Sequence, residues 1–70
     1  PDGTLEPMAQ AIVRALRMPR TVEGVCDHLR LPPYRVRSTM RELAEAALVT
    51  ESDGVFRLTD SGRRRLEEMP

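Results

Sequence analysis

The chain has 70 residues, of which 40% are apolar and 31% charged, and its 11 basic residues balance its 11 acidic residues. This composition indicates one small globular domain and argues against a disordered tail or a strongly basic nucleic-acid-binding protein. A single cysteine excludes an internal disulfide, and together with a single histidine it excludes a zinc site built from Cys and His ligands. We expect a cytoplasmic protein without metal, cofactor or membrane span.

The first half of the chain predicts two helices. Residues 1–4 are expected to be the end of a linker, and Thr4 is placed to cap a helix over residues 5–17. Apolar residues recur in this stretch with helical spacing, at Met8, Ala11, Ile12, Ala15 and Leu16. A second helix, capped by Thr21, repeats that spacing at Val22, Val25, Cys26 and Leu29. It must end before Leu31, because a residue that precedes proline disfavours helical backbone.

The second half predicts a helix, a β-hairpin and a closing helix. A third helix begins at Pro33 and runs to about Ala47, with its core stripe at Val36, Met40, Leu43 and Ala47. Residues 48–50 have strand character, Asp53-Gly54 is a strong hairpin-turn signal, and residues 55–58 return with Phe56 and Leu58 on one face. Thr59 or Asp60 then caps the last helix. The predicted fold class is mainly α with a small β-hairpin.

The charges are sorted along the chain although they cancel in total. Residues 14–41 contain seven arginines and two carboxylates, which gives a net charge of +5, whereas residues 42–60 carry a net charge of −4. The arginines at 14, 17, 35, 37 and 41 come from two helices that should pack together, and we expect some of them to form one positive surface.

Two phrases of the sequence carry a resemblance to a known family. The stretch from Met40 to Val49 resembles the phrase that closes the third helix in winged helix-turn-helix regulators of the MarR and ArsR type. The stretch from Phe56 to Gly62 is similar to the Leu-Thr-x-x-Gly phrase that opens their next helix. The resemblance covers roughly residues 8–68 and implies a three-helix core, a two-stranded wing near residues 48–58 and a C-terminal helix. We expect residues 5–69 to form this domain as a part of a larger bacterial protein.

The sequence departs from the family pattern at three places. Ala47 stands where the family has glycine, so the third helix should end less sharply. Arg30-Leu31-Pro32 replaces a turn that commonly contains glycine, and Arg30 is therefore expected to adopt an unfavourable backbone geometry. Glu51 and Asp53 lie in the wing where such domains often carry a basic residue, which argues against DNA binding.

The resemblance implies that the outward face of the third helix enters the major groove of double-stranded DNA. On a helical wheel with Val36 facing the core, that face carries Tyr34, Ser38, Arg41 and Glu45, with Arg37 on its flank. The predicted function is DNA reading for a transcription regulator, and the predicted DNA-binding residues are Tyr34, Arg35, Arg37, Ser38, Arg41 and Arg57.

Two alternatives remain open from the sequence. The domain could instead be a protein-interaction module within a larger assembly, an interpretation favoured by its zero net charge, its acidic wing and Glu45. Alternatively, the exposed face of the third helix is ordinary solvated surface, on which Arg37 and Arg41 could pair with the nearby Glu42 and Glu45 at helical spacing. No set of residues resembles a catalytic site and no Gly-rich phosphate loop is present, so we expect no enzyme activity. Expected partners are double-stranded DNA, a second copy or other domains of the parent protein.

Overall fold

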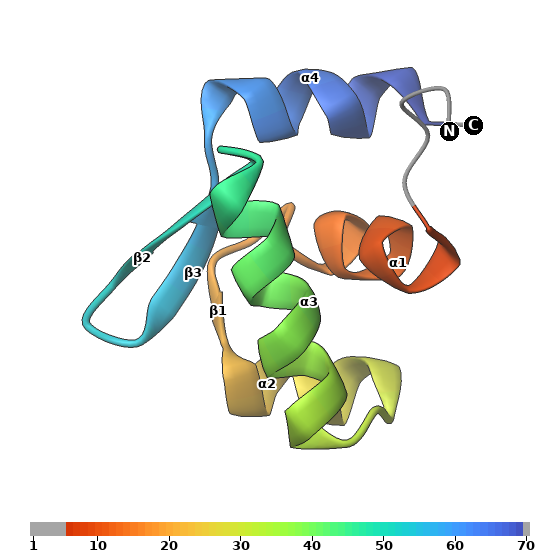
Figure 1. The fold of residues 1–70 in the computed structure, drawn as a ribbon, viewed down its shortest axis with the longest axis vertical. Helices are drawn as coiled ribbons and strands as arrows, with labels where there is room; N and C mark the ends of the chain where they lie inside the picture. Colours follow the sequence, from red (N-terminus) through yellow and green to blue (C-terminus); the bar gives the residue numbers. More distant parts are fainter. Residues whose placement is uncertain (1–5, 70) are drawn as a thin grey trace.

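A computed structural model describes residues 6–69 of the chain (Figure 1). Its elements in chain order are α1 (Pro7–Ala15), β1 (Arg20–Thr21), α2 (Val22–Leu29), α3 (Pro33–Glu45), β2 (Val49–Ser52), β3 (Val55–Leu58) and α4 (Asp60–Glu68). The helices α1, α2 and α3 pack against one another, α4 packs against α1 and β3, and the β2–β3 hairpin projects to one side (Figure 1). Within the described residues no helix is long and apolar enough to cross a membrane.

The core is aliphatic and contains side chains from the apolar stripes that helical spacing predicted for α1, α2 and α3. Its most buried large members are Ile12, Leu16, Met40, Val13, Val25 and Val36. Leu43, Leu48, Val49 and Leu58 complete it where α3 meets the hairpin. The prediction was wrong at Ala47, which is exposed, because α3 has already ended and its chain has turned away from the core. It also missed Ala9 and Val13, which widen the buried stripe of α1.

The first helix is shorter than the predicted range of residues 5–17. It begins at Pro7, which suits a first helical position because the amide there needs no intrahelical acceptor. The predicted cap, Thr4, lies outside the described residues. The helix ends at Ala15, whose carbonyl oxygen accepts a hydrogen bond of 2.7 Å from the Nε of Arg20. That side chain satisfies one of the orphan carbonyls at the end of α1.

The sheet contains one strand that the sequence did not predict. All pairs are antiparallel and the strand order is β1-β3-β2. In β1, Arg20 pairs with Phe56 and Thr21 pairs with Val55. Two residues are too few to show alternation, and β1 forms because the chain between α1 and α2 runs beside the outer edge of β3. The predicted two-stranded wing is therefore part of a three-stranded sheet.

The helices α2 and α3 are each followed by a non-glycine residue with left-handed backbone. Arg30 has φ 57° after α2, and Ala47 has φ 62° after α3. In each case a backbone N–H reaches back five residues, from Leu31 to Cys26 over 3.1 Å and from Leu48 to Leu43 over 2.9 Å. This pattern closes the helix ends and explains why α3 stops at Glu45, two residues before the predicted end. The strain expected at Arg30 is confirmed.

Candidate nucleic-acid interface

The helix α3 divides cleanly into a buried and an exposed side. Val36, Met40 and Leu43 are buried against the other helices and the sheet. The five residues that the sequence singled out on this helix are all exposed: Tyr34, Arg35, Arg37, Ser38 and Arg41. Tyr34 has 72% of its surface exposed, although it is one of only two aromatic residues in the chain. Packing on α1 and α2 holds α3 so that this face points to solvent.

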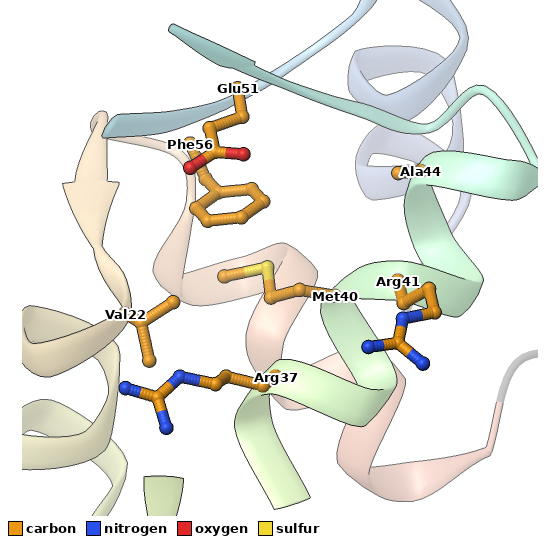
Figure 2. Close-up of a pocket in the computed structure, with 7 residues that line it drawn as sticks. All are labelled: Val22, Arg37, Met40, Arg41, Ala44, Glu51 and Phe56. Carbon is orange, nitrogen blue, oxygen red and sulfur yellow. The ribbon is translucent and has the colours of Figure 1, made fainter. Parts of the chain in front are cut away.

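A groove of about 410 Å³ separates α3 from the hairpin. Arg37 and Arg41 line its α3 side, while Glu51 reaches into it from β2 (Figure 2). Apolar side chains complete the lining, namely Val22, Met40, Ala44 and Phe56. The groove thus combines cationic and apolar surface along α3 with a carboxylate on the opposite side.

The opposite flank of α3 borders a second hollow of about 320 Å³, shared with the start of α1. Tyr34, Arg35 and Ser38 line it together with Glu6, Met8, Thr39 and Glu42. The hydroxyl of Thr39 donates to the sulfur of Met8 over 3.4 Å and links the two helices below this hollow. The five predicted residues of α3 are therefore divided between two hollows. Arg37 and Arg41 border the groove beside the hairpin, and the other three border the hollow beside α1.

Arg57 is not brought together with the arginines of α3. It lies on β3, paired across the hairpin with Thr50, whereas its neighbour Phe56 pairs with Glu51. Successive residues of a strand point to opposite faces, so Arg57 lies on the outer face while Phe56 and Glu51 share the inner one. This separation follows from the alternation that the sequence already indicated for Phe56 and Leu58.

Arg14 of α1 and Arg17, which follows the helix, lie in another hollow, between α1 and α2. Arg14 and Arg17 line this space of about 240 Å³ with His28 and Leu29. They share neither of the two hollows beside α3. The positive surface expected to join α1 and α3 is therefore not formed in one groove.

The two arginines of the groove form no ion pair within the part of the chain that the structure describes. Across residues 6–69, neither Arg37 nor Arg41 forms an ion pair with a carboxylate. The alternative in which they pair with Glu42 and Glu45 on the same helix is thus not observed. Both guanidinium groups keep their donors available for an external acceptor.

Comparison with solved structures identifies the architecture. The structure of this chain is similar to that of the regulator BpsR from Bordetella bronchiseptica, with a TM-score of 0.91 and 26% sequence identity, over 99% of this chain and 55% of that one. It is also similar to a variant of ZitR from Lactococcus lactis, with a TM-score of 0.87 and 23% identity, over 96% of this chain and 51% of that one. The chain has the winged helix-turn-helix fold. No family model and no curated protein matches the sequence.

In this winged helix-turn-helix domain α2 and α3 form the helix-turn-helix and the β2–β3 hairpin forms the wing. The fold class predicted from the sequence is confirmed. The predicted resemblance of the chain to winged-helix transcription regulators of the MarR type is also confirmed. The domain spans about half the length of each of the two proteins.

Sequence reasoning missed the apolar residues of the groove. Val22 and Met40 were assigned to the core stripes of their helices, and both also line the groove. Phe56 was assigned to the same face of the wing as Leu58, and in the structure it is half-buried and lines the groove between α3 and the wing. Its being the only phenylalanine of the chain is a signal that could have drawn attention to this face.

Proposed function

We propose that this domain binds double-stranded DNA through α3 and the wing, as the DNA-reading part of a transcription regulator. The observation that carries the proposal is the charge of the exposed face of α3. From Pro33 to Arg41 this helix presents three exposed arginines and no carboxylate, and its carboxylates, Glu42 and Glu45, follow only in the last turns. In the part of the helix that would enter a major groove, all the charged side chains are thus positive.

The groups on this face suit the two kinds of contact that DNA offers, namely contacts to base edges and contacts to phosphates. The planar guanidinium of Arg37 or Arg41 suits a bidentate contact to the O6 and N7 atoms of guanine or to a phosphate. The hydroxyls of Tyr34 and Ser38 suit bases or phosphates. Arg35, on the other flank, suits a phosphate. The similarity to BpsR, whose DNA binding is regulated by 6-hydroxynicotinic acid, supports DNA as the partner.

A single domain of this size would bind DNA weakly. Regulators of this kind gain affinity by presenting two reading heads to two half-sites, which requires a dimer or further domains. We therefore expect specific binding from the parent protein, while the isolated domain retains the salt-dependent contact to the DNA backbone.

The test is a salt titration of binding to a random-sequence duplex, which needs no knowledge of a target site. The wild type is compared with the double variant Arg37→Ala/Arg41→Ala. A matched control, Arg63→Ala/Arg64→Ala, removes the same charge from the exposed side of α4. Each phosphate contact contributes about one unit to the slope of log K against log salt. The α3 variant should lose affinity and up to two units of slope, and the α4 control should lose much less.

Two results would contradict the proposal. One is a wild type that shows no binding at about 0.1 mM in low salt, the weak end of sequence-independent DNA binding. The other is an α3 double variant that binds as well as the wild type. The first result would favour the protein-interaction module, whose acidic wing and zero net charge suit a protein partner. The second would show that the domain binds DNA through a surface other than this face of α3.

A further inference from the structure

The two carboxylates of the wing have no role in the proposed contact with DNA, yet the structure gives them different positions. Glu51 lies on β2 and reaches into the groove opposite Arg37 and Arg41 (Figure 2). Asp53 lies in the turn at the tip of the wing with φ 53°, and it does not line the groove. Both side chains are exposed.

The register of the hairpin determines the direction of Glu51. It pairs with Phe56, so both side chains lie on the inner face of the wing, and Thr50 and Arg57 lie on the outer face. The pairing of Val49 with Leu58, both buried, anchors this register in the core. A slip by one residue would expose those two apolar side chains, so Glu51 cannot exchange faces with its neighbours.

Glu51 shares the groove with Arg37 and Arg41 but forms no ion pair with either. Within the described part of the chain its carboxylate forms no ion pair or side-chain hydrogen bond. The groove that it enters is the space between the helix and the wing. If α3 lies in a major groove, we expect the sugar-phosphate backbone that borders the groove to pass near this space, which has the arginines on one side and the carboxylate on the other.

We propose that Glu51 is a repulsive residue of the DNA interface, which lowers sequence-independent binding by opposing the phosphate backbone across the groove from Arg37 and Arg41. This inference rests on the proposed function. Interactions between charges in an exposed groove are weakened by salt, so the effect belongs to low ionic strength. Like charges placed against each other suppress the wrong partner and leave binding dependent on the remaining contacts. Here those contacts are the base contacts of α3.

The experiment measures binding of Glu51→Gln to a random-sequence duplex over a range of salt concentrations. Glutamine keeps the length and the polar tip of the side chain and removes only the charge. Two variants make the same change elsewhere: Asp53→Asn at the tip of the wing, where asparagine tolerates left-handed backbone, and Glu67→Gln on the exposed side of α4. Circular dichroism and thermal unfolding verify that each variant is folded.

We expect Glu51→Gln to bind the duplex about threefold to tenfold more tightly than the wild type at low salt. This advantage should shrink as salt is raised. Asp53→Asn should gain less, and Glu67→Gln should stay within about twofold of the wild type. The inference is overturned if Glu51→Gln binds like the wild type, or if either comparison variant gains as much.

The proposed function and this inference fail in distinguishable ways. If the wild type binds, Arg37→Ala/Arg41→Ala weakens binding and Glu51→Gln changes nothing, only the role of Glu51 is wrong. If neither the wild type nor Glu51→Gln binds at low salt, the DNA contact itself is wrong.

Discussion

Gly62 in α4 lies directly against the main-chain carbonyl of Leu48, the residue that connects α3 to the wing. A Cβ at position 62 would overlap that carbonyl oxygen and would also lie 3.1 Å from a methyl carbon of Leu58. The carbonyl cannot easily move away, because it accepts a hydrogen bond of 3.1 Å from the backbone N–H of Thr59. The glycine of the Leu-Thr-x-x-Gly phrase is therefore required by packing, and α4 is seated at the base of the wing.

We expect Gly62→Ala to lower the free energy of unfolding by about 2–3 kcal/mol, as overpacking against a fixed backbone does. Gly24→Ala is the matched control, since a Cβ there meets its nearest neighbour, Oγ1 of Thr21, at an ordinary 3.4 Å. Alanine at that helical position should be neutral or stabilise by up to about 1 kcal/mol. Chemical denaturation measures both. Equal effects of the two substitutions would show that the approach of Gly62 to Leu48 does not matter.

Thr59 should be the more important of the two threonine helix caps. Its hydroxyl accepts from the backbone N–H of Gly62 over 3.1 Å and donates to the carbonyl oxygen of Ala47 over 2.6 Å. The hydroxyl of Thr21 accepts from the backbone N–H of Gly24 over 3.0 Å and, within residues 6–69, makes no second hydrogen bond like that of Thr59. We expect Thr59→Ala to cost about 2 kcal/mol of stability and Thr21→Ala about 1 kcal/mol.

The conservative variant Thr59→Ser keeps both hydrogen bonds and should stay close to the wild type in the same denaturation experiment. If Thr59→Ser loses as much stability as Thr59→Ala, the lost methyl packing and not the hydrogen bonds is responsible.

Ala47→Gly should stabilise the domain, although it removes a methyl group. Ala47 has φ 62°, a conformation that glycine adopts without the steric cost an L-residue bears. After the larger loss of chain entropy by glycine, we expect a gain of about 0.5–1 kcal/mol. The neighbouring Ala46 has φ −83°, so Ala46→Gly should lower stability. Thermal unfolding should show opposite shifts in Tm, and shifts of the same sign would refute the strain at Ala47.

Arg57 should contribute less to DNA binding than Arg37. It lies on the outer face of the wing, whereas Arg37 lines the groove beside α3. On a random-sequence duplex at low salt we expect Arg37→Ala to weaken binding about tenfold and Arg57→Ala less than about threefold. Equal losses would mean that the outer face of the wing also meets the DNA backbone.

The sequence by itself determined the order of the four helices and the β2–β3 hairpin, and most of the core. The spacing of Val36, Met40 and Leu43 and the turn at Asp53-Gly54 are local signals, because helical periodicity and turn chemistry depend only on near neighbours in the chain. The same local reasoning identified the exposed face of α3, since a residue opposite a buried stripe must face solvent. The left-handed backbone at Arg30 was expected from the family resemblance, because the corresponding turn commonly contains glycine.

Only the tertiary structure decided which distant residues meet. The strand β1 exists because the edge of β3 lies beside it. Its two residues are too few to show a strand pattern from which this pairing could be predicted. The approach of Gly62 to Leu48 depends on how α4 docks, and the sequence marked that glycine only through a family phrase. Likewise, Glu51 shares a groove with Arg37 and Arg41 because the hairpin register and the packing of α3 together set the distance between wing and helix. Such contacts depend on the summed geometry of several packed elements, and no periodicity within one element encodes them.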